Sequence, residues 1–357
     1  MTEQKSILRI TVVVMAMFAL ILDAETALGG AKDGIDICTK VIIPSIFPFL
    51  IISHLLTGLL SQQKLHFPAI IRKMLHIPVN AESIFLMGLL GGYPVGAQCI
   101  TQSYHNGNLR KNDAQRMLSF CNNAGPSFIF GIGALLFDDK RLCWVVWCIH
   151  IISALAVGII TPAHEDTEIC KSNSKTISQK NIIQRAVVTM STICGWVLIC
   201  RIILAFLDQW FLWMLPCELS VLISGLFELA NGTTRLLSNP SQEMRFILFS
   251  VMLGFGGLCV GLQTYSIVKE AGLSATSYFP GKIIQASISA LLSMLYSALK
   301  WKQTRNIMYF GLGIVILLFA IFLTVKPKKD MVFFRHLMYN ESKLPGGNTY
   351  EIVSKRC

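Results

Sequence analysis

Long apolar runs alternate with short polar connections along most of the chain. A membrane-spanning helix needs about 20 mainly apolar residues, and ten runs approach that length. They lie at residues 7–28, 41–60, 83–100, 117–137, 142–160, 186–207, 211–230, 246–265, 283–299 and 307–325. The pattern predicts an all-α, polytopic integral membrane protein in which some of the runs need not cross the bilayer.

The composition supports a membrane protein. Hydrophobic residues fill 53% of the 357 positions and charged residues only 14%, and the mean hydropathy is +0.58, which is too apolar for a water-soluble protein of this length. The net charge of +11 comes from Lys and Arg between the runs and in the tail. Cytoplasmic loops carry this excess under the positive-inside rule, so nucleic acid is not an expected partner.

The first run has two interpretations. Lys5 and Arg9 precede it, and the small residues Ala24 and Ala27 follow it, as in a secretory signal peptide. Its length and the many runs behind it favour a retained span instead.

A polar stretch, HEDTEICKSNSKTISQKN, separates two halves of the chain. The expected organisation has five parts. They are an N-terminal transmembrane helix at 1–30, a first repeat at 31–162, a polar cytoplasmic linker at 163–184, a second repeat with the final membrane helices at 185–325, and a cytoplasmic tail at 326–357.

Two related motifs break the apolar pattern. GGYPVGAQ at 91–98 and GGLCVGLQ at 256–263 both read GG-x-x-VG-x-Q, and they lie 256 − 91 = 165 positions apart. Duplicated halves with glycine-interrupted apolar segments predict a transporter-like core in which broken or re-entrant helices meet near the midplane. The alternative is that these glycines only allow close helix packing. The candidate substrate-binding residues from the two motifs are Gly91, Gly92, Gln98, Gly256, Gly257 and Gln263.

A third break is expected at FCNNAGPSFIFG, residues 120–131, where Asn122 and Asn123 stand before Gly125 and Pro126. Proline frees a backbone carbonyl one turn earlier, and a carboxamide offers both a donor and an acceptor. The two amides and Gly125 are therefore candidate binding residues, with local capping of the backbone as the alternative.

An acidic residue follows another apolar run in GLFELANGTTRLL, residues 225–237. A carboxylate at membrane depth is costly and usually functional, so Glu228, with Asn231 behind it, is a candidate for binding a solute or a coupling ion. Alternatively, Glu228 lies at the interface or pairs with Arg235. Arg201 and Asp208 are expected to form a structural pair.

Enzymatic chemistry is not expected. The chain contains no HExxH, GxSxG or phosphate-binding GxxxxGK[ST] motif. Its 11 cysteines include no CxxC pair and lie mostly in apolar runs, so they are expected to be packing residues rather than metal ligands or a disulfide framework. No metal and no cofactor is expected.

The glycine, amide and acidic motifs, in this order along the chain, resemble the YlbJ family of sporulation integral membrane proteins. VIIPSIFPFLIIS at 41–53 resembles the opening of the same domain, and the resemblance covers roughly residues 5–325. It implies a duplicated core built on the nucleoside-recognition or Gate domain. Two departures are the tail after Val325 and Cys259, which stands opposite Pro94 in the repeat.

The resemblance implies a transporter-like protein that acts in sporulation, in spore cortex formation, and moves or senses a small polar solute. Gate domains also occur in nucleoside transporters and in ferrous-iron transporters, so the domain does not establish the solute. A non-transporting scaffold for envelope or cortex assembly is the main alternative, and a nucleoside transporter is another. The expected partners are the lipid bilayer, a small polar solute or coupling ion, and other sporulation membrane proteins.

The sharpest expectation concerns the site. Gln98, Asn123, Glu228, Asn231 and Gln263 are predicted to converge on one polar cavity near the midplane, where the amides orient a neutral solute and Glu228 carries ion or proton coupling.

Both termini are predicted to lie in the cytoplasm, because Lys5 and Arg9 flank the first run while Lys326, Lys328 and Lys329 follow the last. About eight to ten crossings, in an even number, are then expected. A reporter fused after Lys329 should be active only on the cytoplasmic side, and activity restricted to the outside would contradict this topology.

Overall fold

The computed structural model describes residues 2–60, 69–78, 81–161, 182–239 and 241–301. Helices fill most of these ranges and no strand occurs within them, which confirms the predicted all-α class. The expected tail at 326–357 and the last apolar run at 307–325 lie outside the described residues, as does nearly all of the expected linker at 163–184.

Seventeen helical segments follow one another in the described parts of the chain. They are α1 (Thr2–Leu22), α2 (Ala24–Ile37), the π-helix η1 (Cys38–Ile42), α3 (Ile43–Leu60), α4 (Ala69–Leu75), α5 (Glu82–Gly91), α6 (Val95–His105), α7 (Lys111–Cys121), α8 (Pro126–Leu136), α9 (Arg141–Ile160), α10 (Ile182–Trp210), the 3₁₀-helix η3 (Leu212–Met214), α11 (Cys217–Phe227), α12 (Leu229–Leu236), α13 (Gln242–Phe255), α14 (Leu258–Glu270) and α15 (Tyr278–Trp301).

The chain divides into two compact units. Of the described residues, the first unit contains those up to Ala24 and the second those from Glu25 on. In the first unit, α1 exposes apolar side chains such as Met15 and Leu22, as expected of a helix that faces lipid. The second unit contains all of the candidate binding residues.

Several helices are long and apolar enough to cross a bilayer. Among the described residues these are Arg141–Ile160, Ile182–Trp210, Gln242–Glu270 (α13 and α14 taken together) and Tyr278–Trp301, and a fifth span is counted if the helices on either side of Asp23 form one. The protein is therefore a multi-pass membrane protein. The predicted eight to ten crossings stay a prediction.

Four of the apolar runs are divided between shorter helices in the part of the chain described. The divisions separate α5 from α6, α7 from α8, α11 from α12, and α13 from α14. At the two GG motifs the backbone enters the left-handed region, with φ of 76° at Gly92, 82° at Gly256 and 86° at Gly257. Only glycine adopts these angles without strain, which explains why the helices end there.

The helix ends repeat the sequence shift of 165. Helices α6 and α14 end at His105 and Glu270, and 270 − 105 = 165. The same shift places residues 111–136, which α7 and α8 cover, on residues 276–301, which α15 covers from Tyr278 on. The broken pair α7–α8 in the first half therefore corresponds to the unbroken α15 in the second.

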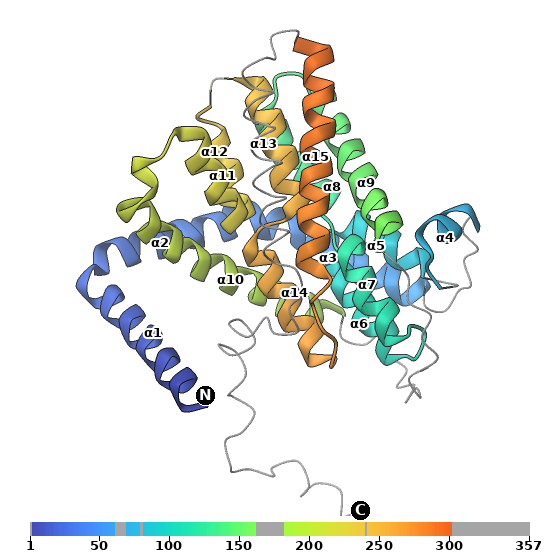
Figure 1. The fold of residues 1–357 in the computed structure, drawn as a ribbon, viewed down its shortest axis with the longest axis horizontal. Coiled ribbons are helices and arrows are strands. Elements are labelled where there is room, and N and C mark those ends of the chain that lie inside the picture. The colour runs from blue at the N-terminus through green and yellow to red at the C-terminus, as the bar shows by residue number, and fades with distance from the viewer. Residues whose placement is uncertain (1, 61–68, 79–80, 162–181, 240, 302–357) are drawn as a thin grey trace, which may run out of the picture. The chain divides into compact units, whose positions relative to one another are not determined.

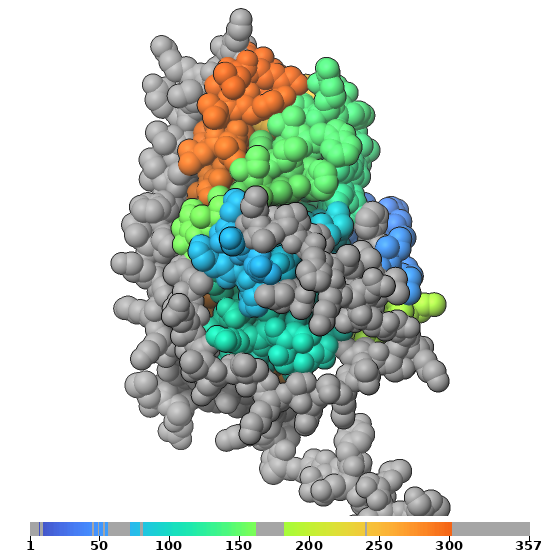
Figure 2. All heavy atoms as spheres, turned by 90° about the vertical axis from the view of Figure 1, so that its right-hand side faces the viewer, coloured from blue at the N-terminus to red at the C-terminus, as the bar shows by residue number. Residues whose placement is uncertain are grey.

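Helix α15 packs against α13, α9 and α7, and Figure 1 shows it running alongside α13. The face in Figure 2 shows α15 beside α9, which also contacts α4. Helix α14 contacts α6 and α10, so the two halves of the chain interlock.

An exposed ion-pair group joins the start of α9 to the end of α15. Asp139 accepts from Arg141 Nε at 3.0 Å and from Lys300 Nζ at 3.0 Å. Hydrogen bonds from Arg141, followed by that from Lys300, hold the pKa of the Asp139 carboxyl well below its usual range. Charged groups of this kind belong in the aqueous phase, so these two helix ends lie outside the hydrocarbon core.

Candidate functional site

A cavity of about 60 Å³ lies where helix breaks from both halves of the chain meet. The breaks α5–α6, α7–α8 and α11–α12 contribute to its wall, together with the first turns of α14. The lining residues are Ile42, Ile46, Gly91, Gly92, Tyr93, Gly125, Ser127, Phe128, Ile193, Val197, Glu228, Leu229, Ala230, Cys259, Val260 and Gln263. The volume holds several water molecules.

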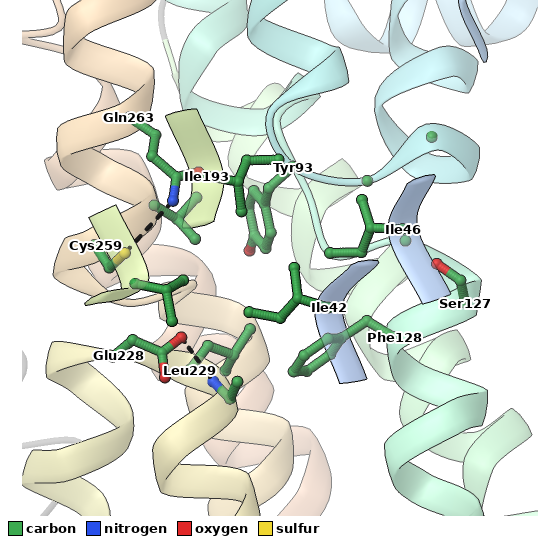
Figure 3. Close-up of a pocket in the computed structure, with 16 residues that line it drawn as sticks. Ile42, Ile46, Tyr93, Ser127, Phe128, Ile193, Glu228, Leu229, Cys259 and Gln263 are labelled. Atoms are coloured by element: carbon green, nitrogen blue, oxygen red, sulfur yellow. Dashed lines mark hydrogen bonds between the residues drawn. The ribbon is translucent and has the colours of Figure 1, made fainter. Parts of the chain in front are cut away.

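The carboxylate, thiol and carboxamide of the cavity lie on one side, and the hydroxyl of Ser127 lies on the other (Figure 3). Figure 3 shows Glu228, Cys259 and Gln263 together, with Ile42 and Phe128 across from them. Most of the remaining wall is apolar. Such a site combines an apolar body with a few placed polar groups, as small-molecule sites usually do.

Close backbone contacts hold the breaks in place. A Cβ on Gly92 would lie 2.8 Å from Gly125 N, and a Cβ on Gly125 would lie 3.1 Å from Gly92 Cα. In the second half, a Cβ on Gly257 would lie 3.3 Å from Leu229 N. In each half of the chain, two breaks therefore contact each other through their backbones, and at least one glycine lies at each contact.

Glu228 is buried and caps the short helix α12. Its Oε1 accepts from Ala230 N at 3.0 Å and its Oε2 accepts from Asn231 N at 2.6 Å. A carboxylate at a helix N-terminus is stabilised by the free N–H groups and the helix dipole. Each oxygen keeps a further lone pair, so Glu228 can also accept from a group in the cavity.

The neighbouring charged residues pair elsewhere. Arg235 pairs with Asp208 and donates to Ser224 Oγ at 2.8 Å, so the alternative pair between Glu228 and Arg235 is not formed. The expected pair of Arg201 with Asp208 is wrong as well, because Arg201 Nη2 donates to Asp33 Oδ2 at 2.6 Å. Partners from other helices outcompete the residue seven positions along the same helix.

Gln263 and the two GG motifs have different places at the site. Gln263 lines the cavity and donates through Nε2 to Cys259 Sγ at 3.4 Å. Gly256 lies under Tyr93, whose hydroxyl would be 2.6 Å from a Cβ at that position. Gly91 and Gly92 line the cavity, whereas Gly256 and Gly257 pack behind it.

Asn122 joins the two halves of the chain rather than lining the cavity. Its Oδ1 accepts from Ala97 N in α6 at 3.3 Å, and its Nδ2 donates to Thr264 Oγ1 in α14 at 2.8 Å. Tyr93 makes a second link, donating from its hydroxyl to Leu253 O at 3.0 Å. These bonds satisfy polar groups that lipid could not.

Gln98 and Asn231 are buried or half-buried beside the breaks. Gln98 donates through Nε2 to Thr189 Oγ1 in α10 at 2.9 Å, and its Oε1 is buried without a described partner. Asn231 offers its backbone N–H to Glu228, while its side-chain Nδ2 is buried without a described partner. Neither side chain is part of the cavity lining.

Asn123 belongs to a second polar cluster, which sequence reasoning missed. Its Oδ1 accepts from Lys282 Nζ at 3.2 Å and from Gln285 Nε2 at 3.1 Å. In the same region, His150 Nε2 accepts from Ala124 N at 3.1 Å. Lys282 directly precedes an apolar run in the sequence, and a lysine at that place is expected to lie at the membrane–water interface. The one indication that it is buried is the shift of 165, which aligns Lys282 with the buried Met117.

The polar groups do not form a metal centre of the usual kind. Within the described ranges, no three His, Cys, Asp or Glu side chains are grouped closely enough to hold a metal ion.

The chain is similar to the sporulation integral membrane protein YlbJ of Bacillus subtilis (strain 168). The two are 23% identical over 339 aligned residues, which cover 80% of this chain and 83% of that protein. No protein-family profile and no solved structure matches the chain. The similarity confirms the resemblance that the glycine, amide and acidic motifs indicated.

The backbone contact between Gly92 and Gly125 predicts that substitutions at two glycines differ in their effect on stability. Gly92→Ala forces a side chain into a φ of 76° and within 2.8 Å of Gly125 N, so it should lower the free energy of unfolding by roughly 1–3 kcal/mol. Gly131→Ala in α8 is the control, because nothing lies within 4 Å of its Cβ position, and it should be neutral or slightly stabilising. Thermal unfolding of the two purified variants in detergent measures both effects. Equal unfolding midpoints would contradict the close contact between Gly92 and Gly125.

Proposed function

We propose that the protein is transporter-like and acts in sporulation. Its similarity to a sporulation integral membrane protein over most of its length is the starting point. On this proposal it moves or senses a small polar solute during spore cortex formation, through a duplicated Gate-type core. The observation that carries the proposal is the meeting of helix breaks from both halves at one cavity. We propose neither catalysis nor a cofactor.

The chemistry of the cavity supports a small solute with a polar end. Glu228 supplies the carboxylate, Gln263 a carboxamide and Ser127 a hydroxyl, and isoleucine, valine and phenylalanine side chains cover the rest of the wall. A cationic group on the solute, or a coupling proton, would lie at Glu228. The amide of Gln263 can orient a neutral polar group without a charge penalty.

The breaks also supply a way for the site to open. Short helices joined by glycine can rotate separately, and solute sites at discontinuous helices are typical of transporters built from repeats. At about 60 Å³ the cavity holds several waters. A nucleoside, the alternative solute, would require the helices around the cavity to move apart.

Removing the charge of Glu228 tests the proposal. Glu228→Gln keeps the size of the side chain and one capping acceptor, so it should cost about 1 kcal/mol of stability, the value of one hydrogen bond. Uptake should fall by roughly tenfold or more, since each 1.4 kcal/mol of lost interaction is a factor of ten. Solute uptake by proteoliposomes, screened across nucleosides, amino acids, divalent metals and dicarboxylates, is the measurement.

Glu243→Gln is the matched control. Glu243 is a buried glutamate at the start of α13 that accepts from Ser297 Oγ at 2.5 Å, and it is not part of the cavity lining. Its replacement should leave uptake unchanged. If no solute is taken up by the unmodified protein, and both variants restore sporulation in a deletion strain, the breaks are packing features and the non-transporting scaffold is the better interpretation.

A further inference from the structure

Lys282 is a fully buried lysine inside a membrane-spanning helix. It lies in α15, one of the helices able to cross the bilayer, and its exposed fraction is 0%. In the part of the chain described, it forms no ion pair with a carboxylate. An ionisable group at such a place is costly and by default functional.

The groups that contact Lys282 Nζ are of the kinds that bind an ammonium group. Nζ donates to Gln285 Oε1 at 2.7 Å and to Asn123 Oδ1 at 3.2 Å. The ring centroids of Tyr93 and Tyr278 lie 5.7 and 5.9 Å from Nζ, within the range of cation–π attraction. An ammonium group has donors and no acceptor, and its neighbours present oxygen atoms and ring faces to match.

The orientation of the two amides is fixed by other bonds. Gln285 Nε2 donates to Asn123 Oδ1 at 3.1 Å and approaches His150 O at 3.5 Å, while Asn123 Nδ2 donates to Phe120 O at 2.7 Å. Both amide oxygens are therefore held toward Lys282 whether or not the lysine is present. They form a preformed pair of ligands for a cation.

The cluster lies at the end of a half-helix. Helix α7 stops at Cys121, and Asn123 follows in the break before α8. The close approach of α15 is shown by Gly281, where a Cβ would lie 2.8 Å from Ser119 O in the last turn of α7. The C-terminal end of a helix carries partial negative charge, and transporters with discontinuous helices hold their coupling cation at such ends.

We propose that Lys282 is a built-in cation that occupies an intramembrane site for a monovalent cation between the α7–α8 break and α15. Its ammonium group stands where a sodium or potassium ion would otherwise bind Asn123 and Gln285. The consequence for transport rests on the proposed function: a cation tethered to the protein makes solute movement independent of those ions.

Emptying the site tests the proposal without any knowledge of the solute. Lys282→Ala removes the ammonium and leaves both amide oxygens with space between them, whereas Lys282→Met fills the space without a charge. Thermal unfolding in detergent is followed in sodium, potassium or lithium chloride and in choline chloride at equal ionic strength. The alanine variant should be destabilised in choline and should gain several degrees in a saturable response to one of the small cations.

Three proteins should show no such response. They are the unmodified protein, Lys282→Met, and Lys300→Ala, which removes a lysine from the exposed end of the same helix. If the alanine variant folds only in the presence of a small cation, the proposal is supported. An alanine variant that follows the salt response of the methionine variant overturns it, and so does an alanine variant that fails to fold in every salt while the methionine variant folds.

Uptake separates this inference from the proposed function. With a solute found in the proteoliposome screen, uptake by the unmodified protein should proceed equally in sodium and in choline media. A missing thermal response, with uptake still dependent on Glu228, would reject the built-in cation alone. A thermal response in a protein that takes up no solute would leave the cation site in place and reject transport.

Discussion

The structure depends on one constraint: a backbone that leaves the helix at membrane depth must find its hydrogen-bond and packing partners inside the protein. The chain satisfies this constraint because its helix breaks contact each other in pairs. Gly92 contacts Gly125 in the first half, and Gly257 contacts the start of α12 in the second. Tyr93 donates a hydrogen bond to the carbonyl of Leu253 in the second half, and the Glu228 carboxylate accepts from two N–H groups at the start of α12. The cavity lies beside these contacts, and Gly91, Gly92 and Gly125 are part of its wall.

The positions of the breaks could be predicted from sequence because their residues do not suit an unbroken membrane helix. Glycine pairs and an amide before proline are poor choices for a lipid-facing helix, and the helices do end at Gly91, at Cys121 and at Phe255. The shift of 165 in the GG motifs reappears at the ends of α6 and α14, His105 and Glu270, which supports a duplication that extends beyond the motifs. Helix propensities were enough to predict the breaks, because each break depends on residues that are adjacent in the sequence.

The directions of the polar side chains could not be predicted in the same way. Asn122 and Asn123 are adjacent, yet one joins α6 to α14 and the other faces α15. The sequence spacing of Arg201 and Asp208 suggested a pair, but each found a partner on a different segment. These choices depend on which helices pack together, and tertiary contacts are not encoded in the spacing along one segment.

The two segments related by the shift of 165 differ where they meet. In the first, the helix is broken and offers amides and the carbonyl end of α7, whereas the corresponding α15 is continuous and carries Lys282 and Gln285. A second break at the same place would add another set of free backbone groups and no cation to balance them. A continuous helix instead brings an ammonium group to the end of α7 and packs against α13, α9 and α7 at once. The polar cluster thus needs both segments, because the broken helix supplies the Asn123 oxygen and the unbroken one supplies Gln285 and the charge that both amides hold.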